Sequence, residues 1–364
     1  MPNWRGRLEE IYGEGAAVQL DRYQAAIQRF KEVYDPGSLG IYRVPGRVNL
    51  IGEHTDYQQG YVLPVALDKD IVILARRRDD AMVSLHNVGP FAPRQFVASR
   101  DIPCGPAGDW GNYAQGAVQM LCRVAGKPLH GMDILVAGEA PHSVPRGAGL
   151  SSSSALTVGV AFVLADLNRL NFAPAELAWL CGEAEWYVGT RGGIMDQFIA
   201  LLGRRDHALF LDCRARIDNP GSIPRFHTEQ VPLPAGYSII VADTKVRHQN
   251  IRSDFNVRVA EGRIGVTLLK RAFSNITHLR DLENYPWPSI EPLLPETLTR
   301  QELADLGLSL ATLIDVELPD TGEPFRVRAR CRHVVTENAR VRESVSALRC
   351  GDVGRFGALM NEAH

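Results

Sequence analysis

A glycine- and serine-rich segment in the middle of the chain has the residue types that bind phosphate groups. It reads Gly-Ala-Gly-Leu-Ser-Ser-Ser-Ser at residues 147–154 and leads into an apolar helix expected to reach about residue 168. Glycines let the backbone approach a ligand closely, and the free N–H groups and positive dipole at a helix N-terminus attract anions. The segment lacks the lysine of a Walker A loop, and a glycine turn capped by serines would look the same. On its own it therefore predicts an anion site without excluding a plain turn.

A second segment, residues 46–57, gathers ionisable side chains directly after a strand that is expected to be buried. Glu53, His54 and Asp56 fall within four residues of one another. Carboxylates beside an imidazole suit a polyol, whose hydroxyl groups form charge-assisted hydrogen bonds with such acceptors. A metal site is another chemistry open to them, although a single histidine without a matching cluster elsewhere argues against it. A polar turn without a ligand fits the same spacing.

A third segment, residues 189–198, contains Asp196 in what should be the first turn of a helix, where the dipole favours a carboxylate. Glu185 lies eleven residues earlier, on the preceding helix, and is suited to hold magnesium. A helix-capping aspartate and a surface glutamate would produce the same pattern. This segment therefore adds two candidate carboxylates without assigning a role to either.

Helices and strands must place these three segments, and hydrophobic patterning predicts where they lie. Apolar residues at three- and four-residue spacing predict further helices at residues 17–34, 110–124, 174–189 and 194–202. Short β-like runs predict strands at 41–44, 48–51, 71–75, 82–86, 95–98, 132–137, 209–211 and 237–242. The last of these is nearly all apolar, so we expect it to be buried. Strands mixed with helices, without regular βαβ alternation, favour an α+β fold.

The composition is that of an ordinary globular protein, because 45% of the 364 residues are hydrophobic and 23% are charged. This length predicts two domains, with the Pro-rich residues 217–234 as the boundary. The net charge of −2 gives no reason to expect a nucleic-acid partner or an anionic membrane. Six scattered cysteines without a CxxC pair predict neither a zinc site nor a disulfide framework. The N-terminal residues lack the apolar core of a secretory signal, and a cytoplasmic location is expected.

Together and in this order the three segments are specific, and the chain resembles the sugar kinases of the GHMP superfamily, most of all the galactokinases. The stretches that carry the resemblance are GRVNLIGEHTDY at 46–57, PRGAGLSSSSAL at 145–156 and GGIMDQF at 192–198. The resemblance implies a two-lobed α+β fold. It places an N-terminal lobe with a mixed sheet over residues 1–222 and a C-terminal α+β lobe over residues 223–364.

The resemblance also implies an activity, the ATP-dependent phosphorylation of the anomeric C1 hydroxyl group of galactose. Asp196 would act as the base, or orient and polarise that hydroxyl group, and Arg47 would neutralise charge near the transferring phosphoryl group. The residues implied in sugar binding are Glu53, His54, Thr55, Asp56, Gly193 and Phe255.

The same resemblance also implies which residues bind ATP and Mg²⁺. Ser153 and Glu185 would hold Mg²⁺, and Trp110 would lie near the adenine of ATP, although ordinary core packing explains a tryptophan there equally well. The partners expected are a small-molecule sugar and ATP, bound by a monomer. The residues implied around the ATP phosphates are Gly147, Ala148, Gly149, Leu150, Ser151, Ser152 and Ser153.

Three departures from the galactokinase pattern stand out. Phe255 occupies the place of a tyrosine that touches the sugar, and residues 185–193 (EWYVGTRGG) are one residue shorter than usual. Both features are similar to those of the N-acetylgalactosamine kinases. The glycine-rich motif that follows the MNEAH stretch in the family is absent after residues 360–364, so a truncated C-terminal lobe is expected. The apolar stripe of residues 356–363 would then be left partly exposed.

Three alternatives to galactose phosphorylation follow from these departures. The first is a kinase for N-acetylgalactosamine or another related sugar, and the second is a non-catalytic sensor that binds galactose and ATP. The third is a truncated, poorly active remnant. Sensors of this family carry a shortened serine motif. The intact serine run at 151–154, with Arg47 and Asp196 present, therefore favours the enzyme.

Overall fold

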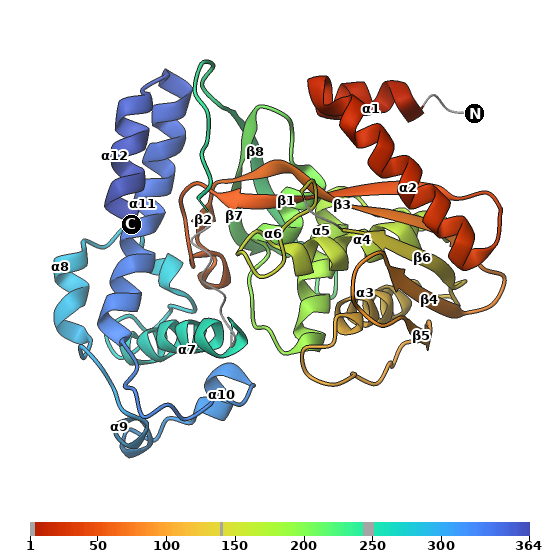
Figure 1. Ribbon diagram of the computed structural model, residues 1–364. Helices are drawn as coiled ribbons and strands as arrows, with labels where there is room; N and C mark the ends of the chain where they lie inside the picture. Colours follow the sequence, from red (N-terminus) through yellow and green to blue (C-terminus); the bar gives the residue numbers. More distant parts are fainter. Residues whose placement is uncertain (1–3, 139–140, 243–250) are drawn as a thin grey trace. The chain divides into compact units, whose positions relative to one another are not determined.

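The computed structural model describes residues 4–138, 141–242 and 251–364 (Figure 1). By its contacts the chain forms two compact units. The first comprises Met1–Arg47 and Ala66–Val188, and the second comprises Val48–Val65 and Gly189–His364. The predicted division at residue 222 lies inside the second unit. Because that division follows the motifs of each lobe and not the contacts, it stays a prediction.

The first unit is built on a five-stranded mixed sheet in the order β1-β3-β6-β4-β5. β6 pairs antiparallel with β3 and parallel with β4, and β4 pairs antiparallel with β5. All of β6 is buried, as its nearly continuous apolar run predicts. β1 runs through Pro45 and Gly46, where we expected a break between two strands. The strands are β1 (Gly40–Asn49), β3 (Pro64–Arg77), β4 (Met82–Asn87), β5 (Arg94–Val97) and β6 (Met132–Ala137).

Helices cover both faces of this sheet (Figure 1). α2 packs its apolar face on Val72 and Leu74 of β3. Ile73 points to the opposite face, where α4 approaches so closely that a Cβ atom on Gly159 would lie 2.4 Å from the Ile73 Cδ1 atom. α4 is apolar on nearly all sides, which explains why most of it is buried. The helices described in this unit are α1 (Trp4–Tyr12), η1 (Gly13–Gly15), α2 (Ala16–Tyr34), α3 (Gly111–Val124), α4 (Ser152–Leu167), α5 (Pro174–Glu185) and η3 (Trp186–Val188).

The second unit contains a three-stranded antiparallel sheet in the order β2-β7-β8. Its strands are β2 (Tyr61–Val62), β7 (His207–Arg216) and β8 (Arg225–Pro232). β8 lies within residues 217–234, which we expected to be a boundary between domains. β8 pairs with β7 along most of its length, so this stretch is partly a strand and not wholly irregular. The boundary placed in it stays a prediction. A polar, proline-bearing sequence is compatible with a strand that is only partly buried.

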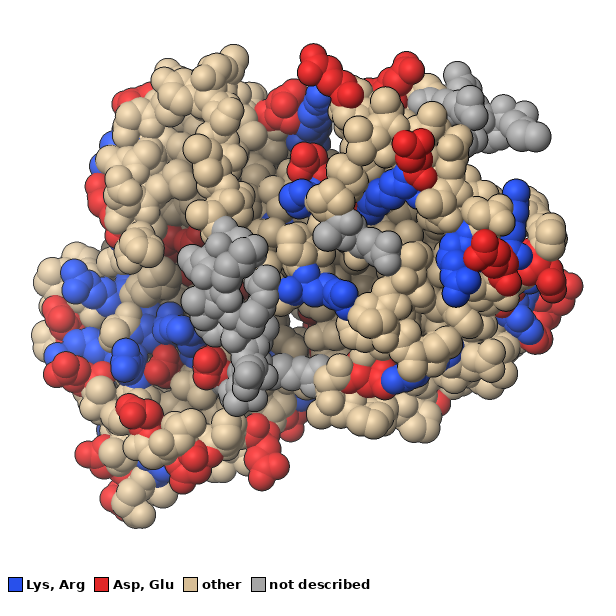
Figure 2. Space-filling view, in the orientation of Figure 1, with Lys and Arg blue, Asp and Glu red and all other residues tan. Residues whose placement is uncertain are grey.

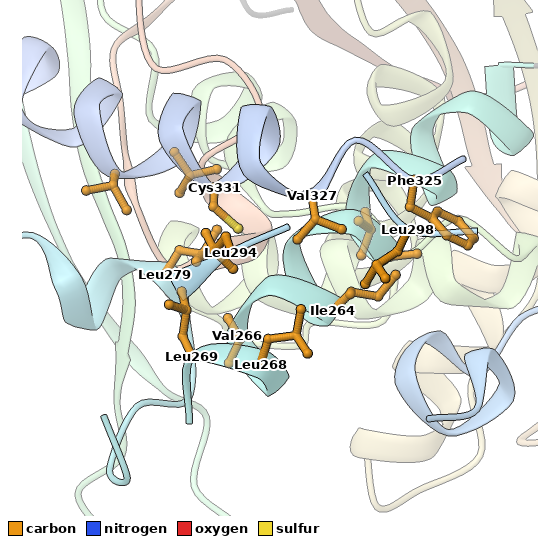
Figure 3. Packing of buried hydrophobic residues seen from close by; sticks show 14 of the residues in the cluster. Ile264, Val266, Leu268, Leu269, Leu279, Leu294, Leu298, Phe325, Val327 and Cys331 are labelled. Carbon is orange, nitrogen blue, oxygen red and sulfur yellow. The ribbon is translucent and has the colours of Figure 1, made fainter. Parts of the chain in front are cut away.

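Helices make up the rest of the second unit, and their core lies between α7 and α11. Figure 3 shows Val327 and Cys331 of α11 among the apolar residues of this core. A Cβ atom on Gly265 of α7 would lie 2.1 Å from the Cys331 Sγ atom, so only glycine allows the two helices to pack this closely. The helices of this unit are η2 (Asp56–Gln58), α6 (Met195–Leu202), α7 (Ile251–Leu269), η4 (Leu279–Leu282), α8 (Trp287–Ile290), η5 (Glu291–Leu293), α9 (Arg300–Asp305), α10 (Leu310–Ile314), α11 (Val327–Cys350) and α12 (Val353–Ala363).

The apolar run at residues 237–242 does not form the buried strand that we predicted. Among the described residues it has no strand partner, and its side chains are exposed, including 67% of Tyr237 and 89% of Ile240. A strand is stable only where a neighbouring strand takes its N–H and C=O groups. Residue composition alone therefore predicted this segment wrongly.

The last helix, α12, packs on α11 (Figure 1). Gly351 ends α11 in the left-handed conformation (φ 72°), and the Asp352 carboxylate accepts a hydrogen bond from the Arg355 N–H group at 2.9 Å. This tight turn folds α12 back, so that Phe356 and Leu359 join the core formed with α11. The expectation that the stripe of residues 356–363 is partly exposed is wrong for these two side chains.

Both units combine sheets with helices, and the predicted α+β fold is confirmed. On the face seen in Figure 2, basic side chains lie among acidic ones, in keeping with the net charge of −2. Across the described residues, no helix combines the length and the apolar character needed to cross a membrane.

We predict that Leu359→Ala lowers the free energy of unfolding by about 2–5 kcal/mol, because it removes a fully buried side chain from the contact between α12 and α11. Met360→Ala, at the neighbouring and 36% exposed position, should change it by about 0.5 kcal/mol or less. Urea denaturation of both variants measures the difference. Equal stability of the two variants would contradict the packing of α12.

Candidate active site

The loop before α4 has a backbone shaped to bind an anion. Gly147, Gly149 and Ser151 have left-handed φ angles of 65°, 74° and 61°, and each is separated from the next by one residue with negative φ. Such alternation turns successive N–H groups toward one side and forms a concave anion-binding nest. Ser151 is also the N-cap residue of α4, so the nest continues into the positive end of that helix. Among the described residues, a Cβ atom on Gly149 would meet nothing within 4 Å, which leaves room for a ligand.

Arg47 lies against this loop. Its Nη1 atom donates to the Gly149 carbonyl oxygen at 2.6 Å, and its backbone N–H group donates to the Leu150 carbonyl oxygen at 3.4 Å. The preceding residue, Gly46, has no space for a side chain, because a Cβ atom would lie 2.9 Å from the Val144 methyl groups. The structure therefore places a guanidinium group beside the candidate phosphate loop.

Ser153 and Glu185 belong to two helices of the first unit that pack on each other. Ser153 lies in the first turn of α4, Glu185 is the last residue of α5, and both are partly exposed. A hydroxyl and a carboxylate oxygen are the hard ligands that Mg²⁺ prefers. The described residues contain no group of three or more His, Cys, Asp or Glu ligands, so a cation here needs phosphate or water oxygens as well. The donor set fits magnesium bound together with a nucleotide.

Trp110 is largely covered by its neighbours. Only 9% of it is exposed, its Nε1–H group donates to the Ala92 carbonyl oxygen at 3.0 Å, and its ring stacks on Phe91 at 5.6 Å between centroids. Phe91 is 40% exposed, and the Arg146 guanidinium lies 4.6 Å from its ring centre. These contacts agree with the packing role that the sequence left open for Trp110. Of the two stacked rings, the one exposed to solvent is that of Phe91.

The sugar segment of the second unit is a tight loop from Gly52 to Tyr61. Gly52 and His54 have left-handed φ angles of 98° and 57°. Thr55 is fully buried, and its hydroxyl group lies 2.9 Å from the Gly52 carbonyl oxygen and 2.7 Å from that of Tyr61. These two contacts hold the loop closed, and the expected contact of Thr55 with substrate stays a prediction.

His54 is neutral at physiological pH. Burial, and then the nearby Arg330 and Arg258 guanidinium groups, lower its pKa to about 3. Its ring lies 5.5 Å from the Phe255 ring between centroids, and its Nδ1 atom lies 3.2 Å from the Tyr57 hydroxyl oxygen. His54 therefore supplies a hydrogen bond and an apolar face without a charge, and Phe255 closes one side of the loop.

Asp56 and Gly193 are in direct contact. A Cβ atom at Gly193 would lie 2.0 Å from the Asp56 Oδ2 atom, so only glycine fits beneath this carboxyl group. The charge of Asp56 contributes to the raised pKa of the Cys213 thiol, after burial, which is the main cause. Asp196 follows three residues after Gly193, in the first turn of α6. The second and third segments recognised in the sequence thus meet in the second unit.

Residues of α11 that the sequence did not single out hold the same loop. Glu337 accepts a hydrogen bond from the Gly52 N–H group at 2.7 Å, and Asn338 accepts one from the Tyr61 N–H group at 3.0 Å. Both residues are fully buried. Their only sequence signal is polar character among the apolar residues of a helix, which does not say what they contact.

Two protein-family models match the chain. The galactokinase galactose-binding signature matches residues 28–77, and the GHMP kinases N terminal domain matches residues 112–204. A galactokinase from Roseiflexus sp. (strain RS-1) is 39% identical over 343 residues, which cover 93% of this chain and 75% of that protein. A galactokinase from Chloroflexus aggregans is 36% identical over 347 residues, which cover 95% of this chain and 77% of that protein.

The chain belongs to the galactokinase family. The fold agrees, because the structure of Lactococcus lactis galactokinase complexed with galactose matches it with a TM-score of 0.72 and 29% identity. That match covers 94% of this chain and 78% of the Lactococcus chain. The resemblance inferred from the three segments is thereby confirmed.

The two family models divide the galactokinase-like site between them. The galactose-binding signature includes Arg47 and the Gly52–Tyr61 loop, and the GHMP domain includes the phosphate loop, Glu185 and Asp196. Phe255 and Trp110 lie outside both matched ranges. The sequence pattern left the role of Phe255 open, because it replaces a tyrosine of the family, and that of Trp110 open, because core packing explains it equally well.

We predict that the His54 imidazole does not titrate between about pH 5 and about pH 8, because its folded pKa lies well below the ordinary value of about 6.5. Carbon-13 NMR of labelled histidines measures this, and the signal that disappears in His54→Gln assigns the residue. A His54 signal with a midpoint near 6.5 would show that the imidazole is solvated and the packing against Phe255 is wrong.

Proposed function

We propose that this chain transfers the γ-phosphoryl group of ATP to the anomeric C1 hydroxyl group of galactose, forming galactose 1-phosphate and ADP. The observation that carries the proposal is the contact of Asp56 with the Gly193 backbone. It joins the segment matched by the galactose-binding signature to the helix N-terminus that carries Asp196. Relatives at 36–39% identity are galactokinases, which favours galactose over its 2-acetamido derivative.

On the sugar side, Asp196 takes the proton of the C1 hydroxyl group or orients that group for attack. Glu53, His54, Asp56 and the Gly193 N–H group bind the remaining hydroxyl groups, with Phe255 closing the loop through its ring. Since Phe255 has no hydroxyl group, its contribution is limited to apolar contact. Neutral His54 suits an uncharged sugar, because an imidazole without charge donates and accepts hydrogen bonds.

On the nucleotide side, residues 147–153 bind the ATP phosphates through backbone N–H groups and serine hydroxyl groups. Arg47, held at Gly149, stabilises the negative charge of the transferring phosphoryl group. Ser153 and Glu185 would hold Mg²⁺, which supplies charge neutralisation on the phosphate oxygens when it is bound. Trp110 acts on the adenine side through the Phe91 ring that it supports.

Phosphoryl transfer depends mainly on positioning and electrostatic stabilisation, and the residues above provide both. We further propose that the protein acts as a cytoplasmic monomer on these two small molecules. These two assignments follow from the sequence expectations alone.

We predict that Asp196→Asn lowers kcat at least about a hundredfold, because the amide neither accepts the proton nor polarises the hydroxyl group, while galactose still binds. Galactose-dependent ADP release measures kcat, and calorimetry measures binding. Asp305→Asn, an exposed aspartate at the end of α9, is the matched control and should keep the wild-type rate. Wild-type protein that binds galactose without releasing ADP would overturn the proposal in favour of a sensor.

We predict that Gly193→Ala raises the KM for galactose at least about tenfold, since a new methyl group cannot occupy the position of the Asp56 carboxyl group. Gly192→Ala is the control, because a Cβ atom there lies no closer than 3.7 Å to the nearest atom, on Thr190. Steady-state kinetics at saturating ATP compare the two variants. An unchanged KM in Gly193→Ala would remove Asp56 from the sugar site.

A further inference from the structure

The Gly52–Tyr61 loop is fastened to α11 at three points. Glu337 and Asn338 accept the N–H groups at its two ends, and the Nε2 atom of His333 lies 2.7 Å from the Glu53 carbonyl oxygen. Glu337 and Asn338 are fully buried. A helix far away in the sequence therefore determines where the backbone of the candidate sugar loop lies.

One of these residues also contacts a side chain of the loop. The carboxyl groups of Glu337 and Glu53 share a hydrogen bond, which requires one proton between them. Glu337 already accepts the Gly52 N–H group and forms an ion pair with Arg340 at 2.7 Å. Each Glu337 oxygen thus already accepts an N–H group. The O–H group that the pair needs is therefore placed on Glu53, and it donates to Glu337.

We propose that Glu337 is a positioning residue for sugar binding: it holds the Gly52 backbone and the Glu53 carboxyl group, and so sets the oxygen that Glu53 presents to a sugar hydroxyl group. This inference rests on the proposed function. Glu337 is not assigned contact with the substrate and acts through Glu53 and the loop backbone.

The arrangement makes galactose binding sensitive to pH near neutrality. Glu53 is exposed as a residue, but its carboxyl group lies against α11. Loss of water around that group, and the neighbouring Glu337 charge, raise its pKa to about 7. Above this pH Glu53 loses its proton, so the hydrogen bond between the two carboxyl groups is lost and they repel each other. Since the proton is bound below the folded pKa and lost above it, affinity for galactose falls as pH rises.

Other charged groups surround Glu53 and Glu337. The experiment has to distinguish their titration from that of these two carboxyl groups. His54 does not titrate in this range, because its pKa is lowered to about 3. His333 contacts the Glu53 backbone and needs its own variant. The charged and titratable groups around the loop and α11 include His54, Asp56, Tyr57, Tyr61, Arg258, Glu261, Arg280, Glu283, Arg330, His333, Arg340 and Arg342.

The test is isothermal titration calorimetry of galactose binding to the full chain without nucleotide, from about pH 6 to about pH 8. Leaving ATP out removes the titration of its phosphate groups. We expect the affinity of the wild-type protein to fall about tenfold over this range, as the protonated fraction falls through an apparent pKa of about 7. Near pH 7, binding should also take up protons, which buffers of different ionisation enthalpy reveal.

Glu337→Gln should flatten this pH dependence. Its amide N–H group can donate to an ionised Glu53, and its amide oxygen can still accept the Gly52 N–H group, so no shared proton is needed. His333→Gln should keep the wild-type slope. Ser346→Ala, on an exposed turn of α11 away from the loop, is the matched control and should also keep it.

A wild-type slope in Glu337→Gln, or a pH-independent affinity in the wild-type protein, would overturn the inference. If Glu337→Gln fails to fold, Glu53→Gln replaces it, since a permanent amide donor toward Glu337 should flatten the slope in the same way. A merely structural Glu337 would lower the fraction of active protein without changing the pH dependence of affinity. Wild-type protein that does not bind galactose at any pH would instead overturn the proposed function.

Discussion

Backbone contacts with no room for a side chain hold the candidate site together in each unit. Gly46 brings the end of β1 onto the phosphate loop, and Gly193 brings the start of α6 onto the Asp56 carboxyl group. In both places a Cβ atom would overlap an atom of the segment it faces, so any other residue would push the two segments apart. Arg47 and Asp196 follow these glycines by one and three residues. Their positions are therefore set by close packing more than by their own side-chain contacts.

The sugar loop and α11 depend on each other for polar partners. Glu337 and Asn338 are buried, and a buried acceptor without a donor costs about 1–3 kcal/mol. The loop supplies those donors from its Gly52 and Tyr61 N–H groups, which would otherwise be left unpaired themselves. The stability of α11 and the ordering of the loop are thus energetically coupled. This coupling explains why polar residues lie on the buried face of α11 in a protein whose chemistry is performed elsewhere.

Local patterns predicted what depends on local structure. The nest at residues 147–151, the helix start at Asp196 and most elements of the first unit follow from glycine placement and hydrophobic period. Contacts between distant segments were not predictable in this way. Residues 237–242 have the composition of a buried strand, yet they are exposed because strand pairing is a property of two segments. For the same reason no local pattern indicates that Glu337 of α11 accepts the Gly52 N–H group.

The distribution of charge matches the two substrates of a sugar kinase. The phosphate loop combines oriented N–H groups with the Arg47 cation, as an anionic nucleotide requires. In the sugar loop, His54 is neutral, and Glu53, whose pKa is raised to about 7, carries little charge below that pH. A neutral polyol gains most from hydrogen-bonding groups that are already ordered and only partly charged, because each additional charge must be desolvated when the sugar binds. The chain therefore needs no net positive charge to bind ATP, and its overall charge of −2 is compatible with a local anion site built from Arg47 and oriented N–H groups.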